Sequence, residues 1–166
     1  MKKYFGALVL ALALASCSSD APVAESPASA SNTTWEIEHY AYSTDEVKLA
    51  EAINNHRQSI GLAPLETTDY VSVISSEHNQ YMIENNVVNH DNFELRAQEI
   101  IETMGASTVH ENVAYNFSTA SSVLAAWLNS DEHKANIEGD FTHFGVSIRI
   151  DPETGKKFYT NIFVKL

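Results

Sequence analysis

Cys17 is the only cysteine in this 166-residue chain, so its thiol is the only sulfur nucleophile that the sequence offers. A single cysteine excludes an internal disulfide and a cysteine-based metal cluster, and it leaves no thiol nucleophile for the body of the chain. A thiolate reacts readily near neutral pH, so Cys17 is suited to covalent attachment of another molecule. The residues that precede it indicate which molecule that is.

Residues 1–16 place lysines at positions 2 and 3, an apolar run at Phe5–Leu14 and two small residues before Cys17. This pattern is typical of a secretory signal peptide, and the run is shorter than the about 20 apolar residues that span a membrane. The segment Leu14-Ala15-Ser16-Cys17 resembles the lipobox of bacterial lipoproteins, in which the cysteine receives a diacylglycerol and becomes the first residue. The resemblance implies a signal peptide at 1–16 and an envelope protein, lipid-anchored through Cys17 to a membrane outside the cytoplasm, facing either the periplasm or the cell surface.

Residues 17–34 are predicted to be the lipidated cysteine and a flexible tether. Positions 18–34 hold five Ser, four Ala, two Pro and two Thr, which cannot bury enough apolar surface to offset the entropy of ordering. Aromatic and aliphatic residues return at Trp35, and 35–166 is the usual size of one domain, which we expect to be monomeric. The formal net charge of −12, without a basic stripe, argues against nucleic-acid binding.

The pattern of apolar residues after Trp35 predicts helices first and a strand pair last. We expect helices over 44–60, 68–85, 93–104 and 119–128, a short helix capped by Ser130, and strands over 108–116, 144–150 and 157–164. His56 and His78 fall on apolar helix faces, so we expect them to be core or capping residues. This order of elements predicts an α+β layered domain.

Several segments, taken in order, resemble the CAP superfamily of cysteine-rich secretory proteins, antigen 5 and pathogenesis-related proteins, especially its cysteine-free bacterial branch. The first helix and its exit match AINNHRQSIGLAPL at 52–65, and the second helix matches HNQYMIENNVVNH at 78–90. The most specific block is HENVAYNFSTASSVLAAWLNSDEHKANI at 110–137, and FTHFGVSI at 141–148 matches the following strand. The resemblance implies a three-layer α-β-α sandwich with a small antiparallel sheet.

The resemblance also implies a central cavity lined by His90, Glu111 and His133, which we expect to meet in space. Ser130 stands at the position of the family's second acid, and His110 stands where most members have glycine. Two imidazoles and a carboxylate can hold zinc or a similar divalent ion, with water completing the coordination. The alternative is a hydrogen-bonded polar cluster that ties loops to the core.

Three functions remain open on the sequence. The first is a non-catalytic module that binds a small ligand, a lipid, a peptide or a cell-wall component; the second is a metal-assisted hydrolase or protease with Glu111 as general base. The third is a scaffold or interaction protein at the envelope. The chain has no Gly-x-Ser-x-Gly elbow, no His-Glu-x-x-His and no Walker loop, so a hydrolase would need metal-bound water as its nucleophile. We therefore favour the binding module.

Overall fold

A four-stranded sheet lies at the centre of the structure, a computed structural model that describes residues 39–166. Its strands follow the order β1-β3-β4-β2, with bounds Glu66–Thr67 (β1), Thr108–Tyr115 (β2), His143–Ile150 (β3) and Lys157–Lys165 (β4). The β3–β4 pair is antiparallel, as expected, and β2 also pairs antiparallel with β4. The short β1 pairs in parallel with β3 and was not predicted. In the described part of the chain, no helix is long and apolar enough to cross a membrane.

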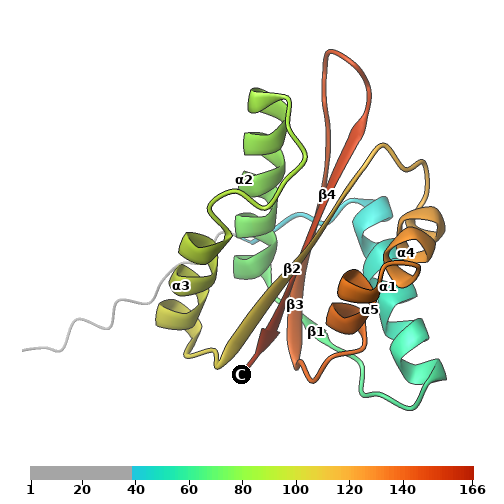
Figure 1. The fold of residues 1–166 in the computed structure, drawn as a ribbon, viewed down its shortest axis with the longest axis vertical. Helices are drawn as coiled ribbons and strands as arrows, with labels where there is room; N and C mark the ends of the chain where they lie inside the picture. Colours follow the sequence, from blue (N-terminus) through green and yellow to red (C-terminus); the bar gives the residue numbers. More distant parts are fainter. Residues whose placement is uncertain (1–38) are drawn as a thin grey trace, which may run out of the picture. The chain divides into compact units, whose positions relative to one another are not determined.

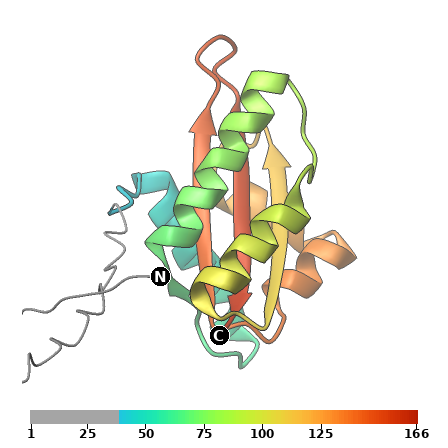
Figure 2. The same ribbon diagram turned by 90° about the vertical axis from the view of Figure 1, so that its left-hand side faces the viewer.

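Helices cover both faces of the sheet and give the three layers that the resemblance implied. Figure 1 shows α2 (Asp69–Asn85) and α3 (Phe93–Met104) on one face, with α1 (Thr44–Ser59), α4 (Ala120–Leu128) and α5 (Asp131–Ile137) on the other. Figure 2 shows α2 and α3 in front of the sheet, with β2, in yellow, at its edge. The predicted α+β sandwich is confirmed.

A capping box fixes the start of α1. Ser43 accepts a hydrogen bond from the Glu46 backbone N–H, and the Glu46 carboxylate accepts one from the Ser43 N–H at 2.7 Å. The same buried carboxylate accepts bonds from the Tyr40 hydroxyl and the Ile148 N–H, both at 2.7 Å. One side chain therefore starts the helix and joins it to β3. The helix ends one residue earlier than expected, because Ile60 is its C-cap and is 48% exposed.

Gly145 allows α2 to lie directly on β3. A Cβ at this position would stand 2.3 Å from the carbonyl carbon of Val71 and 2.4 Å from the nitrogen of Ser72. The Ser72 hydroxyl uses this close approach to accept a hydrogen bond from the Val146 N–H at 3.2 Å. The glycine of the strand is thus required by helix–sheet contact.

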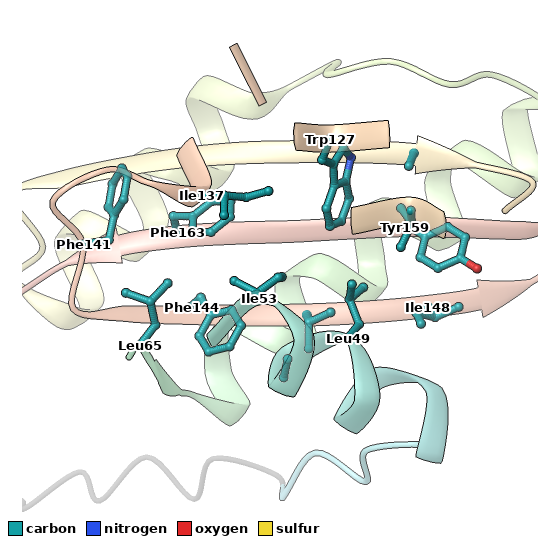
Figure 3. Packing of buried hydrophobic residues seen from close by; sticks show 14 residues of the cluster. Leu49, Ile53, Leu65, Trp127, Ile137, Phe141, Phe144, Ile148, Tyr159 and Phe163 are labelled. Atoms are coloured by element: carbon teal, nitrogen blue, oxygen red, sulfur yellow. The ribbon is translucent and has the colours of Figure 1, made fainter. Parts of the chain in front are cut away.

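The larger apolar core lies between the sheet and the α1, α4 and α5 layer. Figure 3 shows Trp127, Tyr159 and Phe163 packed together with Leu49 and Ile53 of α1. All five are at most 1% exposed. The Trp127 indole N–H donates to the carbonyl of Val113 at 3.0 Å, so the one polar atom of this ring is satisfied where it is buried.

Candidate functional site

Glu111 lies in β2, the edge strand of the sheet, and its side chain is 1% exposed. It shares a face with Val109, which packs against the α2 and α3 layer. Side chains alternate along a strand, so the next residue, Asn112, points to the opposite face, where it contacts α5. Two consecutive residues of one strand therefore serve both sides of the candidate site.

Arg96 of α3 engages both oxygens of the Glu111 carboxylate. Its Nη2 donates to Oε1 at 2.9 Å and to Oε2 at 2.8 Å, and its Nε donates to Oε2 at 3.0 Å. His90, in the loop after α2, adds a contact between its Nδ1 and Oε1 at 2.9 Å. A buried carboxylate needs such partners, and a two-pronged guanidinium contact is the strongest kind that a protein offers.

His78 of α2 also belongs to the cluster around Glu111. Its Nε2 lies 2.9 Å from the carbonyl of Asn89 and 3.8 Å from Glu111 Oε1, and its buried Nδ1 has no hydrogen-bond partner among residues 39–166. Burial lowers the pKa of His78, so the ring stays neutral and Nε2–H donates to Asn89. The prediction that His78 is a core residue is confirmed. His56 is half-buried instead, and its Nε2 pairs with Glu138 at 2.9 Å.

His133 is the third residue of α5 and approaches from the other face of the sheet. Its carbonyl accepts a hydrogen bond from the Asn112 amide at 3.0 Å. Partial burial lowers the pKa of His133, and the charge of a protonated His90 lowers it further. The two imidazoles thus lie within electrostatic reach of each other, while Glu111 contacts His90 directly.

His90, Glu111 and His133 are the residues that could bind a divalent metal. Within residues 39–166, no group of three or more His, Cys, Asp or Glu side chains is arranged to hold one. Arg96 donates to both Glu111 oxygens, so this carboxylate offers no free oxygen to an ion shared with His90 and His133. The zinc ion expected from the sequence stays a prediction, which the Arg96 contacts do not support.

The structure shows the surroundings of Ser130 and His110, the two residues that depart from the pattern of the resembled family. Ser130 is the N-cap of α5 but makes no side-chain capping bond, contrary to expectation. His110 lies in β2, its Nδ1 is 2.7 Å from Asn136 Oδ1, and it is absent from the positive-φ residues of the described chain. Replacing the family's glycine therefore strains nothing at this position.

A well-defined hollow of the described chain lies away from this cluster. A cavity of about 540 Å³ lies between α1 and the segment around β1, and no candidate residue lines it. Its lining includes Tyr42, Asn54, Gln58 and Leu65. The cavity that the resemblance implied around Glu111 remains a prediction, whereas the contact between His90 and Glu111 is present.

Arg96 is the residue that sequence reasoning missed. The sequence pointed to a hydrogen-bonded cluster of Glu111 with His90 and His133, without a guanidinium. Arg96 is one of three arginines in the chain, and it follows His90 by six positions. A buried acid and a nearby arginine at the start of a predicted helix were the available signals.

Comparison with known proteins decides the family. Residues 50–164 match the sequence model of the cysteine-rich secretory protein family, CAP. The chain belongs to this family. Residues 1–18 match the prokaryotic membrane lipoprotein lipid attachment site. This CAP protein is therefore a lipid-anchored protein of the cell envelope that faces outside the cytoplasm.

Curated relatives of this CAP protein include two from Bacillus subtilis. The membrane protein YlbC is 30% identical over 126 residues, which cover 74% of this chain and 35% of YlbC. YkwD is 32% identical over 127 residues, which cover 74% of this chain and 49% of YkwD. The chain therefore spans between a third and a half of the length of these relatives.

Solved structures share the fold. An outer surface protein of Borrelia burgdorferi has a TM-score of 0.67 at 23% identity, covering 76% of this chain and 97% of the other. An extracellular protein with an SCP domain from Bacillus anthracis has a TM-score of 0.65 at 26% identity, covering 74% and 40%. A cysteine-rich secretory protein of Staphylococcus aureus has a TM-score of 0.61 at 24% identity, covering 74% and 38%.

Proposed function

We propose that this CAP protein is a non-catalytic binding module, held at a membrane by the lipid on Cys17, with its ligand site at the β2 edge. His90 and His133 are the side chains that face the ligand, and Glu111 holds His90 from beneath. The ligand class is a small molecule, a lipid, a peptide or a cell-wall component. Its place outside the cytoplasm gives the module access to all four.

The engagement of Glu111 by Arg96 carries this proposal. A general base needs a carboxylate lone pair aimed at its substrate, within hydrogen-bonding reach. Both Glu111 oxygens instead accept from Arg96, and Oε1 also contacts His90. The Glu111 carboxylate is thus held by other groups of the protein and is not free to act as a general base, which supports binding over hydrolysis.

The proposed ligand-facing groups are two imidazoles. The His90 side chain is 47% exposed, and its Nδ1 is occupied by Glu111, so Nε2 is the nitrogen left for a ligand. The lowered pKa of His133 keeps that ring neutral at pH 7, with one donor and one acceptor nitrogen. Such a pair suits a ligand that offers both hydroxyl or amide donors and carbonyl acceptors.

Native mass spectrometry of protein extracted in mild detergent tests this function. We expect an additional bound mass on the wild type that His133→Ala loses, together with an unchanged melting temperature. His39→Ala is the matched control, because His39 is 88% exposed and pairs with Asp69 outside the cluster. The control should retain the bound mass.

Two results would overturn the proposal. One is a bound mass that both histidine variants keep to the same extent. The other is hydrolysis that chelators abolish and that Glu111→Gln also abolishes, because this would make Glu111 the general base of a metal-assisted hydrolase.

A further inference from the structure

The helix that carries His133 cannot fix its own position. α5 has seven residues, and helices so short are unstable in water without tertiary contacts. Ser130 stands at its N-cap without a capping bond from its side chain. The place of the His133 ring therefore depends on what holds α5 against the rest of the domain.

The C-terminal end of α5 is held by the core. Ile137 is fully buried among the apolar residues between the layers. The Arg57 guanidinium of α1 donates to the carbonyl of Ile137 at 2.7 Å and to that of Gly139 at 2.9 Å. These contacts act after the His133 position and do not hold the first turn of the helix.

A pair of carboxamides holds the part of the helix nearer to His133. Asn112, fully buried in β2, donates from Nδ2 to the His133 carbonyl at 3.0 Å. Its Oδ1 accepts from Nδ2 of Asn136 at 2.8 Å, and the same Nδ2 lies 3.3 Å from the Glu111 carbonyl. The amide pair therefore joins α5 to the strand segment that carries Glu111.

We propose that Asn112 and Asn136 are positioning residues, which hold α5 on β2 and so set where the His133 ring lies relative to His90. The proposal rests on the proposed function, since His133 matters here as a ligand-facing group. Side chains alternate between the two faces along β2, so two neighbouring residues hold both histidines. Glu111 orients His90 on one face, and Asn112 orients His133 on the other. Displacing a buried amide whose N–H and carbonyl groups are both hydrogen-bonded is also costly, so the position of α5 on β2 is firmly held.

The test measures the reactivity of His133 itself. Diethyl pyrocarbonate modifies neutral imidazoles, and mass spectrometry of peptides gives a rate for each histidine. In full-length Asn112→Ala at pH 7, we expect His133 to react several-fold faster than in the wild type, because α5 swings away from the sheet. His39, which is 88% exposed, serves as the internal reference and should keep its rate.

Asn54→Ala is the matched control. Asn54 of α1 also uses both ends of its carboxamide, donating to the Leu65 carbonyl at 2.9 Å and accepting from the Leu65 N–H at 2.8 Å. Its loss should lower the melting temperature in the same way as Asn112→Ala while leaving the His133 rate unchanged. If both variants accelerate His133 equally, or neither does, the amide pair only stabilises the fold and the proposal is wrong.

Asn136→Ala covers the case in which Asn112→Ala fails to fold. It removes one half of the pair and keeps the bond from Asn112 to the His133 carbonyl, so we expect a smaller acceleration in the same direction. No acceleration in this variant would equally overturn the proposal. None of these rates needs a ligand, so an empty binding site would refute the proposed function and leave this inference standing.

Discussion

Replacing Arg96 by methionine isolates the charge that neutralises Glu111. Methionine keeps much of the apolar stem of arginine and removes the guanidinium, which donates three bonds to Glu111 and one to the Asp91 carbonyl. Glu111 is 1% exposed, so its carboxylate would stay buried with His90 as its nearest partner. Removing one member of a buried ion pair costs about 3–5 kcal/mol. With a urea m-value of about 2 kcal/mol/M for a domain of this size, the unfolding midpoint should fall by roughly 2 M.

A double-mutant cycle with Glu111→Gln separates charge from packing. The neutral amide removes the buried charge, and Arg96, at 13% exposure, can still reach solvent, so we expect this variant to cost about 1–3 kcal/mol. Arg96→Met in the Gln background should then cost about 2 kcal/mol less than it does alone. Lys165→Met is the control, because its partner Asp140 is 88% exposed and such surface pairs contribute little. A cost below about 1 kcal/mol for Arg96→Met would refute the assignment of Arg96 as the essential partner.

Three further outcomes follow from single features. Cys17→Ala should abolish partition of the protein into the detergent phase, because the thiol that carries the lipid is gone. Burial lowers the pKa of His78 below its usual 6.5, so below that pH the unfolded chain binds a proton that the native ring does not. The free energy of unfolding should therefore fall as the pH drops below about 6.5, and it should fall less steeply in His78→Gln. The buried Asn161 amide has no partner in the described chain, so Asn161→Leu should raise the free energy of unfolding by about 1–3 kcal/mol in urea titrations.

The sequence was sufficient for elements whose signals are local. Ser43 with Glu46 three positions later is a capping box, and Gly61 adopts a positive φ where the first helix ends. Alternation predicted β3 and β4 to within one residue at either end. The two-residue β1 escaped because its pairing with β3 is set by the tertiary contact of the loop before α2, and no local pattern marks it.

The candidate site was predictable only in part, because some of its contacts leave no local pattern in the sequence. The resemblance placed His90 and Glu111, and the structure joins them at 2.9 Å. Arg96 was missed because its partner lies 15 positions away in the chain, and spacing along the sequence does not reveal a contact between a helix and an edge strand. The capping bond expected from the Ser130 side chain is absent, and Asn112 holds α5 through the His133 carbonyl.

The same contacts explain how a histidine pair can be held at the edge of the sheet from its two opposite faces. His90 follows α2 on one face, and His133 lies in the first turn of α5 on the other, so no single helix or loop could set the distance between them. The edge strand can do so, because it presents Glu111 to the first ring and Asn112 to the backbone of the second. Arg96 fixes Glu111, and Asn136 fixes Asn112, so each half has its own support. A change in either half should therefore move one imidazole and leave the other in place.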